Sequence, residues 1–238
     1  MMKQKLVVLS GAGVSAESGM KTYRDSNGLW ENYNVQDVAT IDGWYRNPKM
    51  VLEFYNMLRK KLETAQPNEA HKIIAELEKY YDVAVVTQNV DDLHERGGST
   101  NVIHLHGELT KVRPVDDDER RHVKDIGYAD CNLGDCDNRG KQLRPDIVWF
   151  GEAVPMIRKA AEEVSTADIL LIIGTSMQVY PAAGLVGYVK RGTQIYLIDP
   201  QPMRLDYEQF YQIQDKASAG MVRLHEILLK EVKDPNEQ

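Results

Sequence analysis

Two histidines in one short segment are the first candidates for chemistry in this chain. Residues 103–109 read IHLHGEL, and the alternation of an extended strand would place His104 and His106 on the same face. A histidine titrates near neutrality, so one of them could act as a base while the other packs in the core. A metal pair is the alternative, but no third ligand stands at a suggestive spacing, so we assign no metal ligand.

A run of amides and acids precedes the histidines. Residues 87–94 read TQNVDDLH and directly follow the apolar run VAVV. Polar groups at the carboxyl end of a parallel strand lie at the mouth of a ligand site, which makes Gln88, Asn89 and Asp91 candidates for binding a polar substrate. A turn with Asn89 or Asp91 as the N-cap of a helix would use the same residue types.

A glycine-rich turn follows the first apolar run of the chain. Residues 11–16 read GAGVSA, which matches the pattern G-x-G-x-x-A. The glycines permit close approach of the backbone to a pyrophosphate, and the N-terminus of a following helix would favour its negative charge. A plain glycine turn is the alternative. No second strand with a ribose-binding acid follows about 20 residues later, so this is not an ordinary dehydrogenase fingerprint.

Two more segments complete the set of candidates. Residues 144–152 read RPDIVWFGE, which suits either a core strand or an edge strand beside a hydrophobic slot. Gly174, Thr175 and Ser176 follow the apolar run ILLII, where small hydroxylated residues suit a polar ligand or an ordinary turn.

The elements that must position these groups alternate along the chain. Buried parallel strands are predicted at 6–9, 83–87, 169–173 and 195–198. Helical patterns lie at 48–65, 68–80, 155–165, 181–191 and 221–232. This alternation predicts an α/β fold with a Rossmann-like, doubly wound parallel sheet. Two insertions that do not follow this alternation of strands and helices are expected to form a small second lobe.

Composition limits the class of protein. The 238 residues are 42% hydrophobic and 27% charged, as in one globular domain. The net charge, 29 − 36 = −7, argues against nucleic-acid and membrane-surface binding. The first apolar run is too short for a signal-peptide core or a bilayer span, which favours a cytoplasmic location. Two cysteines indicate no disulfide framework, and we expect a monomer.

Taken together, the segments resemble the sirtuins, a family of NAD-dependent protein deacylases. The matching segments, in family order, are GAGVSAESG, TYRDSNGLW, TQNVDDLHERGG, HLHGEL, RPDIVWFGE and GTSMQVYPAAG. Six motifs in register are specific where each one alone is not. The resemblance, which is to bacterial members, implies one sirtuin-type domain over 1–238. Its core would comprise about 1–22, 66–106 and 147–232, and its small lobe about 23–65 and 107–146.

The resemblance implies an NAD site in three parts. The pyrophosphate loop would comprise Gly11, Ala12, Gly13, Ala16 and Glu17, with Arg24 in a loop that covers the dinucleotide. Gln88 and Asn89 would bind the nicotinamide ribose, and Asp91 the carboxamide. The adenosine side would comprise Gly174, Thr175, Ser176, Ala217 and Asp199, the last standing where the family usually has an asparagine.

The resemblance also implies the chemistry. The acyl-lysine amide oxygen attacks C1′ of the ribose as nicotinamide leaves, and His106 takes a proton from a ribose hydroxyl, with Asn89 and Asp91 also catalytic. The products are free lysine, nicotinamide and O-acyl-ADP-ribose. The acyl-lysine peptide would add as a strand between 148–152 and 177–180. Its contacts would be Tyr55, Val148, Phe150, Gly151 and Val179.

This sequence departs from the family in its cysteines. Most sirtuins hold a structural zinc with two cysteine pairs, and Cys131 and Cys136 match only the second pair. Residues 114–117, PVDD, stand where the first pair should lie. Two thiolates do not complete a tetrahedral site, so no zinc is expected, although His122 or an aspartate could complete it. Without zinc, the lobe would be held by packing or be mobile.

A second departure concerns the acyl group. The desuccinylase and demalonylase branch, which the chain otherwise resembles, carries Tyr-x-x-Arg in its acyl pocket. Here Tyr55 is followed by Leu58 at the arginine position, and Arg59 is rotated by about 100° around the helix. We expect Arg59 to be solvated and Leu58 to favour acetyl or apolar acyl groups over succinyl groups.

Three other functions use parts of the same pattern. A mono-ADP-ribosyltransferase or an NAD glycohydrolase would share every NAD residue, and only the peptide cleft around 148–152 and 179–181 argues against it. A non-catalytic NAD- or ADP-ribose-binding module would not need the base His106. A dehydrogenase would need a hydride-acceptor site, and none is evident in the sequence.

Overall fold

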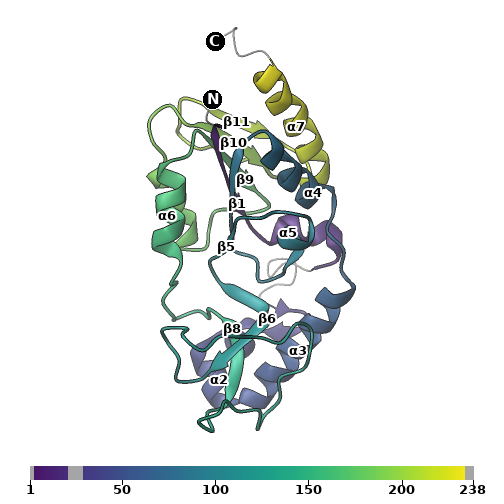
Figure 1. The fold of residues 1–238 in the computed structure, drawn as a ribbon, viewed down its shortest axis with the longest axis vertical. Helices are drawn as coiled ribbons and strands as arrows, with labels where there is room; N and C mark the ends of the chain where they lie inside the picture. Colours follow the sequence, from purple (N-terminus) through teal and green to yellow (C-terminus); the bar gives the residue numbers. More distant parts are fainter. Residues whose placement is uncertain (1–2, 21–28, 234–238) are drawn as a thin grey trace.

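The computed structural model describes residues 3–20 and 29–233. Its centre is a six-stranded parallel sheet in the order β11-β10-β9-β1-β4-β5 (Figure 1). The strands are β1 Lys5–Ser10, β4 Asp82–Thr87, β5 Val102–His104, β9 Ile169–Ile173, β10 Gln194–Ile198 and β11 Phe210–Ile213. The predicted α/β fold with a doubly wound sheet is therefore confirmed.

Helices cover both faces of the sheet, which explains why its central strands are apolar throughout. Leu6 and Val8 of β1 face the cluster formed with α4 Glu69–Glu76 and α7 Ala217–Lys233. Val7 and Leu9 face the opposite cluster, with α6 Ile157–Ser165 and the 3-10 helix η5 Ala182–Tyr188. Figure 1 shows α6 and α7 on opposite sides of the strands. A strand buried on both faces has no polar side to alternate.

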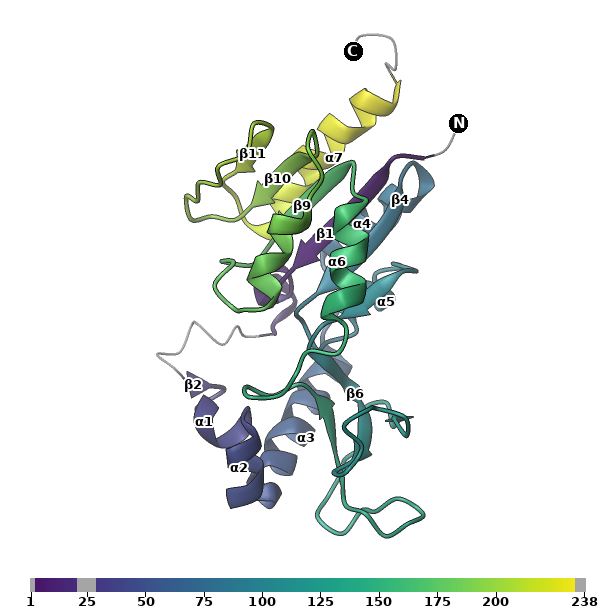
Figure 2. The same ribbon diagram turned by 90° about the vertical axis from the view of Figure 1, so that its left-hand side faces the viewer.

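The small lobe lies beyond the end of the sheet opposite to the two chain termini (Figure 2). An antiparallel sheet in the order β7-β6-β8 forms part of it, with β6 Gly107–Pro114, β7 Lys124–Asp125 and β8 Leu143–Ile147. The rest comprises β2 Leu29–Trp30, β3 Tyr33–Asn34, α1 Val35–Val38, α2 Ile41–Arg46 and α3 Pro48–Thr64. Both predicted insertions contribute to this lobe.

Local chemistry sets the start of α3, the helix that carries Tyr55 and Leu58. The Asn47 side chain accepts a hydrogen bond from the Met50 backbone N–H, and Pro48 is the first residue of α3. An asparagine N-cap followed by proline is a strong start signal. Trp44, Phe54 and Trp149 then bury the inner face of the helix in the lobe core.

The structure corrects the prediction of a helix after the glycine-rich turn. The chain there forms two 3-10 turns, Ala12–Val14 and Ala16–Ser18, rather than an α-helix. The argument from a helix dipole therefore does not apply to this loop. The predicted helix at 181–191 is likewise a 3-10 helix. None of the helices within the described ranges is long and apolar enough to cross a membrane.

Candidate functional site

A cavity of about 700 Å³ lies where the carboxyl ends of the sheet strands meet the lobe. Most of the predicted site residues line it, namely Gly11, Ala12, Gly13, Tyr55, Gln88, Asn89, Asp91, His106, Val148, Phe150, Gly151, Gly174, Thr175, Ser176, Val179 and Asp199. Arg24 lies outside the described residues. The cavity thus brings together motifs that are far apart in the sequence.

Glycines let two loops pack closely at the sheet end of this cavity. The Gly13 N–H donates to the Gly174 carbonyl at 2.9 Å, and the Gly11 N–H donates to the Ile173 carbonyl at 3.1 Å. Gly174 has φ +62, and a Cβ there would lie 2.2 Å from the Val14 nitrogen. The loops after β1 and β9 can therefore approach each other only with glycine at these positions.

The amide-acid loop after β4 is anchored to the glycine-rich loop. The Asn89 Nδ2 donates to Ser15 Oγ at 3.0 Å, and Gln88 Nε2 donates to Thr175 Oγ1 at 3.0 Å. Asp91 is buried, and its Oδ1 accepts the Leu93 N–H at 3.2 Å. Burial raises the pKa of Asp91 to about 6, although a hydrogen bond from Ser15 opposes the shift. A carboxyl group is therefore held at the cavity wall at an energetic cost.

His106 lines the cavity, and one of its ring nitrogens already has a hydrogen-bond partner. Its Nδ1 lies 3.1 Å from the Gln88 carbonyl oxygen. A carbonyl can only accept, so Nδ1 carries the proton and Nε2 is left as an acceptor. Burial lowers the pKa of His106, which keeps the ring neutral at pH 7. A neutral imidazole with a free acceptor nitrogen can act as a general base.

The predicted same-face pairing of the two histidines does not bring both into the cavity. The strand β5 ends at His104, so strict alternation does not continue to His106. The ring of His104 instead contacts the Asn89 carbonyl oxygen and Glu95, outside the cavity lining. Of the pair, His106 alone lines the cavity.

Two further buried histidines, which sequence reasoning missed, lie beneath the loops. The rings of His71 and His94 are 4.9 Å apart, and Ser10 Oγ lies 2.9 Å from His94 Nε2. Ser15 Oγ lies 3.4 Å from His71 Nε2, and burial lowers the pKa of His71 to about 4. The signal available was weak, because His94 ends the TQNVDDLH run and His71 stands alone in a helix.

Three predicted cofactor residues do not reach the cavity lining, namely Ala16, Glu17 and Ala217. The Glu17 carboxylate accepts the Ser218 backbone N–H at 2.9 Å, beside Ala217 at the first position of α7. Glu17 therefore ties the end of the glycine-rich loop to the start of α7. Asp199 does line the cavity, and its Oδ1 accepts the Gln201 N–H at 2.8 Å.

The lobe side of the cavity is an apolar slot. Tyr55 is fully buried, and its hydroxyl accepts the Trp149 Nε1–H at 2.9 Å. Leu58 lies beside it on the cavity wall. The expectation that Arg59 is solvated is wrong, because its Nε donates to the Leu109 carbonyl at 2.6 Å and the residue is fully buried. Arg59 lies outside the cavity lining.

Exposed aromatic residues mark the mouth of the slot. Phe150 is 50% exposed and Tyr180 is 77% exposed, and both line the cavity. The Val148 N–H already donates to the His106 carbonyl at 2.9 Å, and the Phe150 N–H to the Ala39 carbonyl at 2.9 Å. These bonds fix the 148–152 segment to the sheet end and to the lobe at once.

The two cysteines do not fit a zinc site. Cys131 is buried and Cys136 is exposed. Burial raises the pKa of Cys131 to about 11, which opposes the thiolate that zinc needs. Within residues 3–20 and 29–233, neither cysteine belongs to a group of three possible metal ligands. The predicted absence of zinc stays a prediction.

Comparison with known proteins shows which chains this protein is similar to. The Sir2 family profile matches residues 11–181. A Bacteroides thetaiotaomicron protein named NAD-dependent protein deacylase is 50% identical over 230 residues, covering 95% of this chain and 98% of that protein. A Helicobacter pylori protein of the same name is 54% identical over 200 residues, covering 83% and 85%.

Solved structures of Sir2 proteins are also similar to this chain. A structure described as a Sir2 homologue–NAD complex has TM-score 0.85 and 39% identity, covering 97% of this chain and 91% of that chain. One described as Sir2 with a p53 peptide and NAD⁺ has TM-score 0.77 and 29% identity, covering 96% and 95%.

Proposed function

The chain belongs to the Sir2 family and is an NAD-dependent protein deacylase, and we propose that its reaction takes place in the cavity between sheet and lobe, with His106 as general base. NAD supplies the ribose carbon to which the acyl-lysine oxygen bonds as nicotinamide leaves. With one water consumed to break the bond between the acyl carbon and the lysine nitrogen, the products are free lysine, nicotinamide and O-acyl-ADP-ribose. The remaining question is what each residue of this chain does.

Asp91, Asn89 and Gln88 hold the nicotinamide half. A buried carboxylate at Asp91 accepts hydrogen bonds from the carboxamide N–H groups, which orients the leaving group. The amide side chains bind the ribose hydroxyls, and their own bonds to Ser15 and Thr175 limit their rotation. This preorganisation supports the assignment of both amides to the ribose.

Loops after the other strands hold the rest of the dinucleotide. Backbone at Gly11, Ala12 and Gly13 can approach the pyrophosphate, because glycine leaves no Cβ in the way. The adenosine ribose lies at Asp199, whose carboxylate accepts from its hydroxyls. Ala16, Glu17 and Ala217 support the loop from behind, through the bond of Glu17 to α7.

The acyl group enters the slot formed by Tyr55, Leu58 and Trp149. The only polar atom that Tyr55 offers is tied to Trp149. Leu58 presents methyl groups where a dicarboxylic acyl chain would need a cation. The slot therefore favours acetyl and apolar acyl groups over succinyl groups, and the peptide lies along 148–152 and 177–180.

One observation carries the proposal: the bond from His106 Nδ1 to Gln88 leaves Nε2 as the acceptor in a cavity that also contains Asp91. Acetyl-lysine peptide and NAD should yield nicotinamide and O-acetyl-ADP-ribose, detected by mass. His106→Ala should lower kcat/KM by about 10²–10⁴-fold. His122→Ala, at an exposed histidine of the lobe, is the matched control.

Three outcomes would overturn this assignment. Deacylation at an undiminished rate in His106→Ala would show that His106 is not the general base. Release of nicotinamide with free ADP-ribose, and no acyl product, would instead indicate an NAD glycohydrolase, and modified protein would indicate an ADP-ribosyltransferase. The cytoplasmic location and the monomeric state stay predictions.

A further inference from the structure

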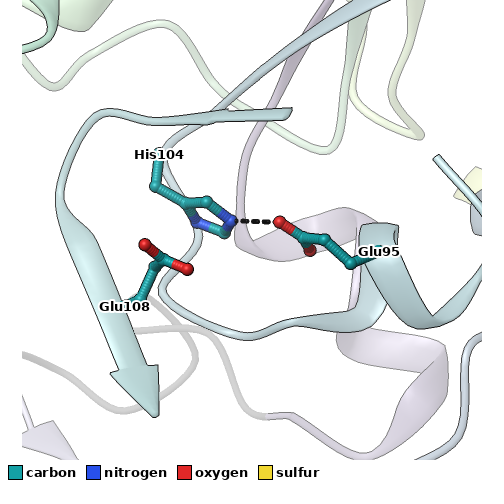
Figure 3. Close-up of side chains that lie close together, drawn as sticks. All are labelled: Glu95, His104 and Glu108. Atoms are coloured by element: carbon teal, nitrogen blue, oxygen red, sulfur yellow. Dashed lines mark hydrogen bonds and ion pairs between the residues drawn. The ribbon is translucent and has the colours of Figure 1, made fainter. Parts of the chain in front are cut away.

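A second group of titratable side chains lies next to the loop of residues 88–91, outside the cavity lining. Glu95 on α5 (Leu93–Arg96), His104 at the end of β5 and Glu108 near the start of β6 each offer one ligand atom, and these atoms lie within 4.8 Å of one another. Figure 3 shows the two carboxyl groups approaching the imidazole from different sides. Sequence reasoning found no third ligand because the acids come from two other elements.

Both ring nitrogens of His104 face acceptors. Nδ1 lies 2.9 Å from the Asn89 carbonyl oxygen, and Nε2 lies 2.8 Å from Glu95 Oε1 (Figure 3). The carbonyl has no proton to give, so Nδ1 must carry one. Nε2 then meets the Glu95 carboxylate, and a carboxylate oxygen of Glu108 lies within 4.8 Å of the other two ligand atoms, so the three groups together favour a positive charge among them. Either a proton or a metal ion can supply it.

Electrostatics around the ring agree with this requirement. Burial alone would lower the pKa of His104, yet the hydrogen bond and charge of Glu95 raise it overall. Conversely, burial opposes ionisation of Glu95, but the bond from His104 holds the pKa of that carboxyl below its ordinary value. The shifts at His104 and Glu95 therefore agree with the short contact between them.

We propose that Glu95, His104 and Glu108 form a site for a divalent transition metal of the zinc class, in which His104 binds through Nε2. Imidazole nitrogen with carboxylate oxygen is a ligand set that suits Zn²⁺. Ligating histidines usually donate the other ring N–H to a carbonyl or carboxylate, as His104 does to Asn89. A neutral imidazole and two carboxylates balance the charge of a divalent ion.

Lys111 is the internal competitor for this site. Its Nζ lies 2.5 Å from Glu108 Oε2, and the side chain is partly exposed. A bound metal ion would compete with that ammonium group for the Glu108 carboxylate. The proposal therefore predicts opposite effects at two neighbouring positions: removing the ligand Glu108 weakens binding, and removing the competitor Lys111 strengthens it.

The site connects to the proposed function through one hydrogen bond. His104 holds the backbone carbonyl of Asn89, whose side chain lines the cavity. Metal at Nε2 fixes the ring and so stiffens the loop that binds the nicotinamide ribose, which should change the KM for NAD more than kcat. This consequence rests on the proposed function, but binding of the metal does not.

Calorimetric titration of the full chain with ZnCl₂, without NAD or peptide, tests the site. A Cys136→Ser background removes the exposed thiol. We expect one Zn²⁺ per chain. Glu108→Gln should weaken binding at least about 10-fold, and Lys111→Met should strengthen it up to about fivefold.

Glu119→Gln, at an exposed acid of the lobe, is the matched control and should leave the affinity unchanged. Weak binding that is the same in all four proteins would mean adventitious surface binding only and would overturn the proposal. Deacylation could fail in any of these proteins without affecting the result, because the readout is the metal titration alone.

Discussion

Two buried aspartates, one at the sheet and one in the lobe, face opposite surroundings. Asp146 of the lobe is fully buried among cations, since Arg113 Nε lies 3.4 Å away and Arg120 contacts its other oxygen. Asp91 at the sheet end is 5% exposed and is held by hydrogen bonds from Leu93 and Ser15. Burial raises the pKa of both carboxyl groups, but two arginines oppose the shift at Asp146, whereas at Asp91 mainly hydrogen bonds oppose it.

The ionic character of the lobe extends to the rim of the cavity. Arg144 donates two bonds to Glu152, at 2.6 and 2.9 Å, and its guanidinium carbon lies 3.5 Å from the centre of the Trp149 ring. The same carboxylate accepts the Trp149 backbone N–H at 2.8 Å. The turn that shapes the acyl slot is thus held by directional charge contacts, whereas the sheet is held by apolar burial.

The largest expected effect comes from breaking the lobe cluster. Asp146→Ala removes the acid that contacts the buried Arg113 and the partly exposed Arg120, and removing one partner of a buried pair costs about 3–5 kcal/mol. Hydrogen exchange should show lost protection in β6 and β8 while β1 and β9 keep theirs. Equal loss in both regions would mean that the lobe is not a separate unit of stability.

The sheet aspartate should respond in the opposite direction. Burial raises the pKa of Asp91 to about 6 from 3.8, so the folded state binds more protons than the unfolded state between these values. Its contribution therefore favours folding at low pH and is lost as pH rises through about 6. Asp91→Asn should raise the free energy of unfolding at pH 8 by about 1–3 kcal/mol.

The same Asp91→Asn variant should lose activity, because asparagine cannot accept both carboxamide N–H groups in the same way. A kcat/KM at least about 10-fold lower is expected, measured with NAD varied. A variant that is less stable at pH 8, or as active as the parent, would remove the contrast between the two acids.

A smaller effect concerns the acyl slot on the lobe side. Leu58→Arg restores the Tyr-x-x-Arg spacing and places a cation on the cavity wall beside Tyr55. The ratio of succinyl to acetyl kcat/KM should rise about 10-fold or more, about 1.4 kcal/mol. Met57→Arg, one position earlier on α3, is the control, and an equal rise there would point to net charge rather than to position.

The smallest expected effect is the pH dependence of kcat/KM in the parent protein. The proposed reaction needs Asp91 ionised and His106 neutral, so kcat/KM should rise with pH and level off above about 6. Burial raises the pKa of Asp91 and lowers that of His106, so ionisation of Asp91 contributes to the acidic limb. In Asp91→Asn this limb should move to lower pH, and an unmoved limb would assign it to another group.

Sequence could predict the sheet because its strands are buried on both faces and therefore read as unbroken apolar runs. The edge strand β11 was not predicted, since its sequence FYQI alternates and is half-exposed. Cavity residues were found where strands end in glycine, amide or hydroxyl groups, because the carboxyl ends of parallel strands converge.

What sequence could not predict depends on partners far along the chain. Arg59 is buried because the Leu109 carbonyl, fifty positions later, accepts its Nε–H. Glu17 caps α7 through Ser218, which no local pattern reveals. The cluster of Glu95, His104 and Glu108 likewise forms only when α5, β5 and β6 come together.

A structure of the chain with NAD and an acetyl-lysine peptide tests the central claim most directly. The nicotinamide carboxamide should lie within hydrogen-bond distance of Asp91, and a ribose hydroxyl should lie within reach of His106 Nε2. The acyl chain should end against Leu58. Nicotinamide bound away from the 88–91 loop, or His106 facing no part of the ribose, would contradict the account.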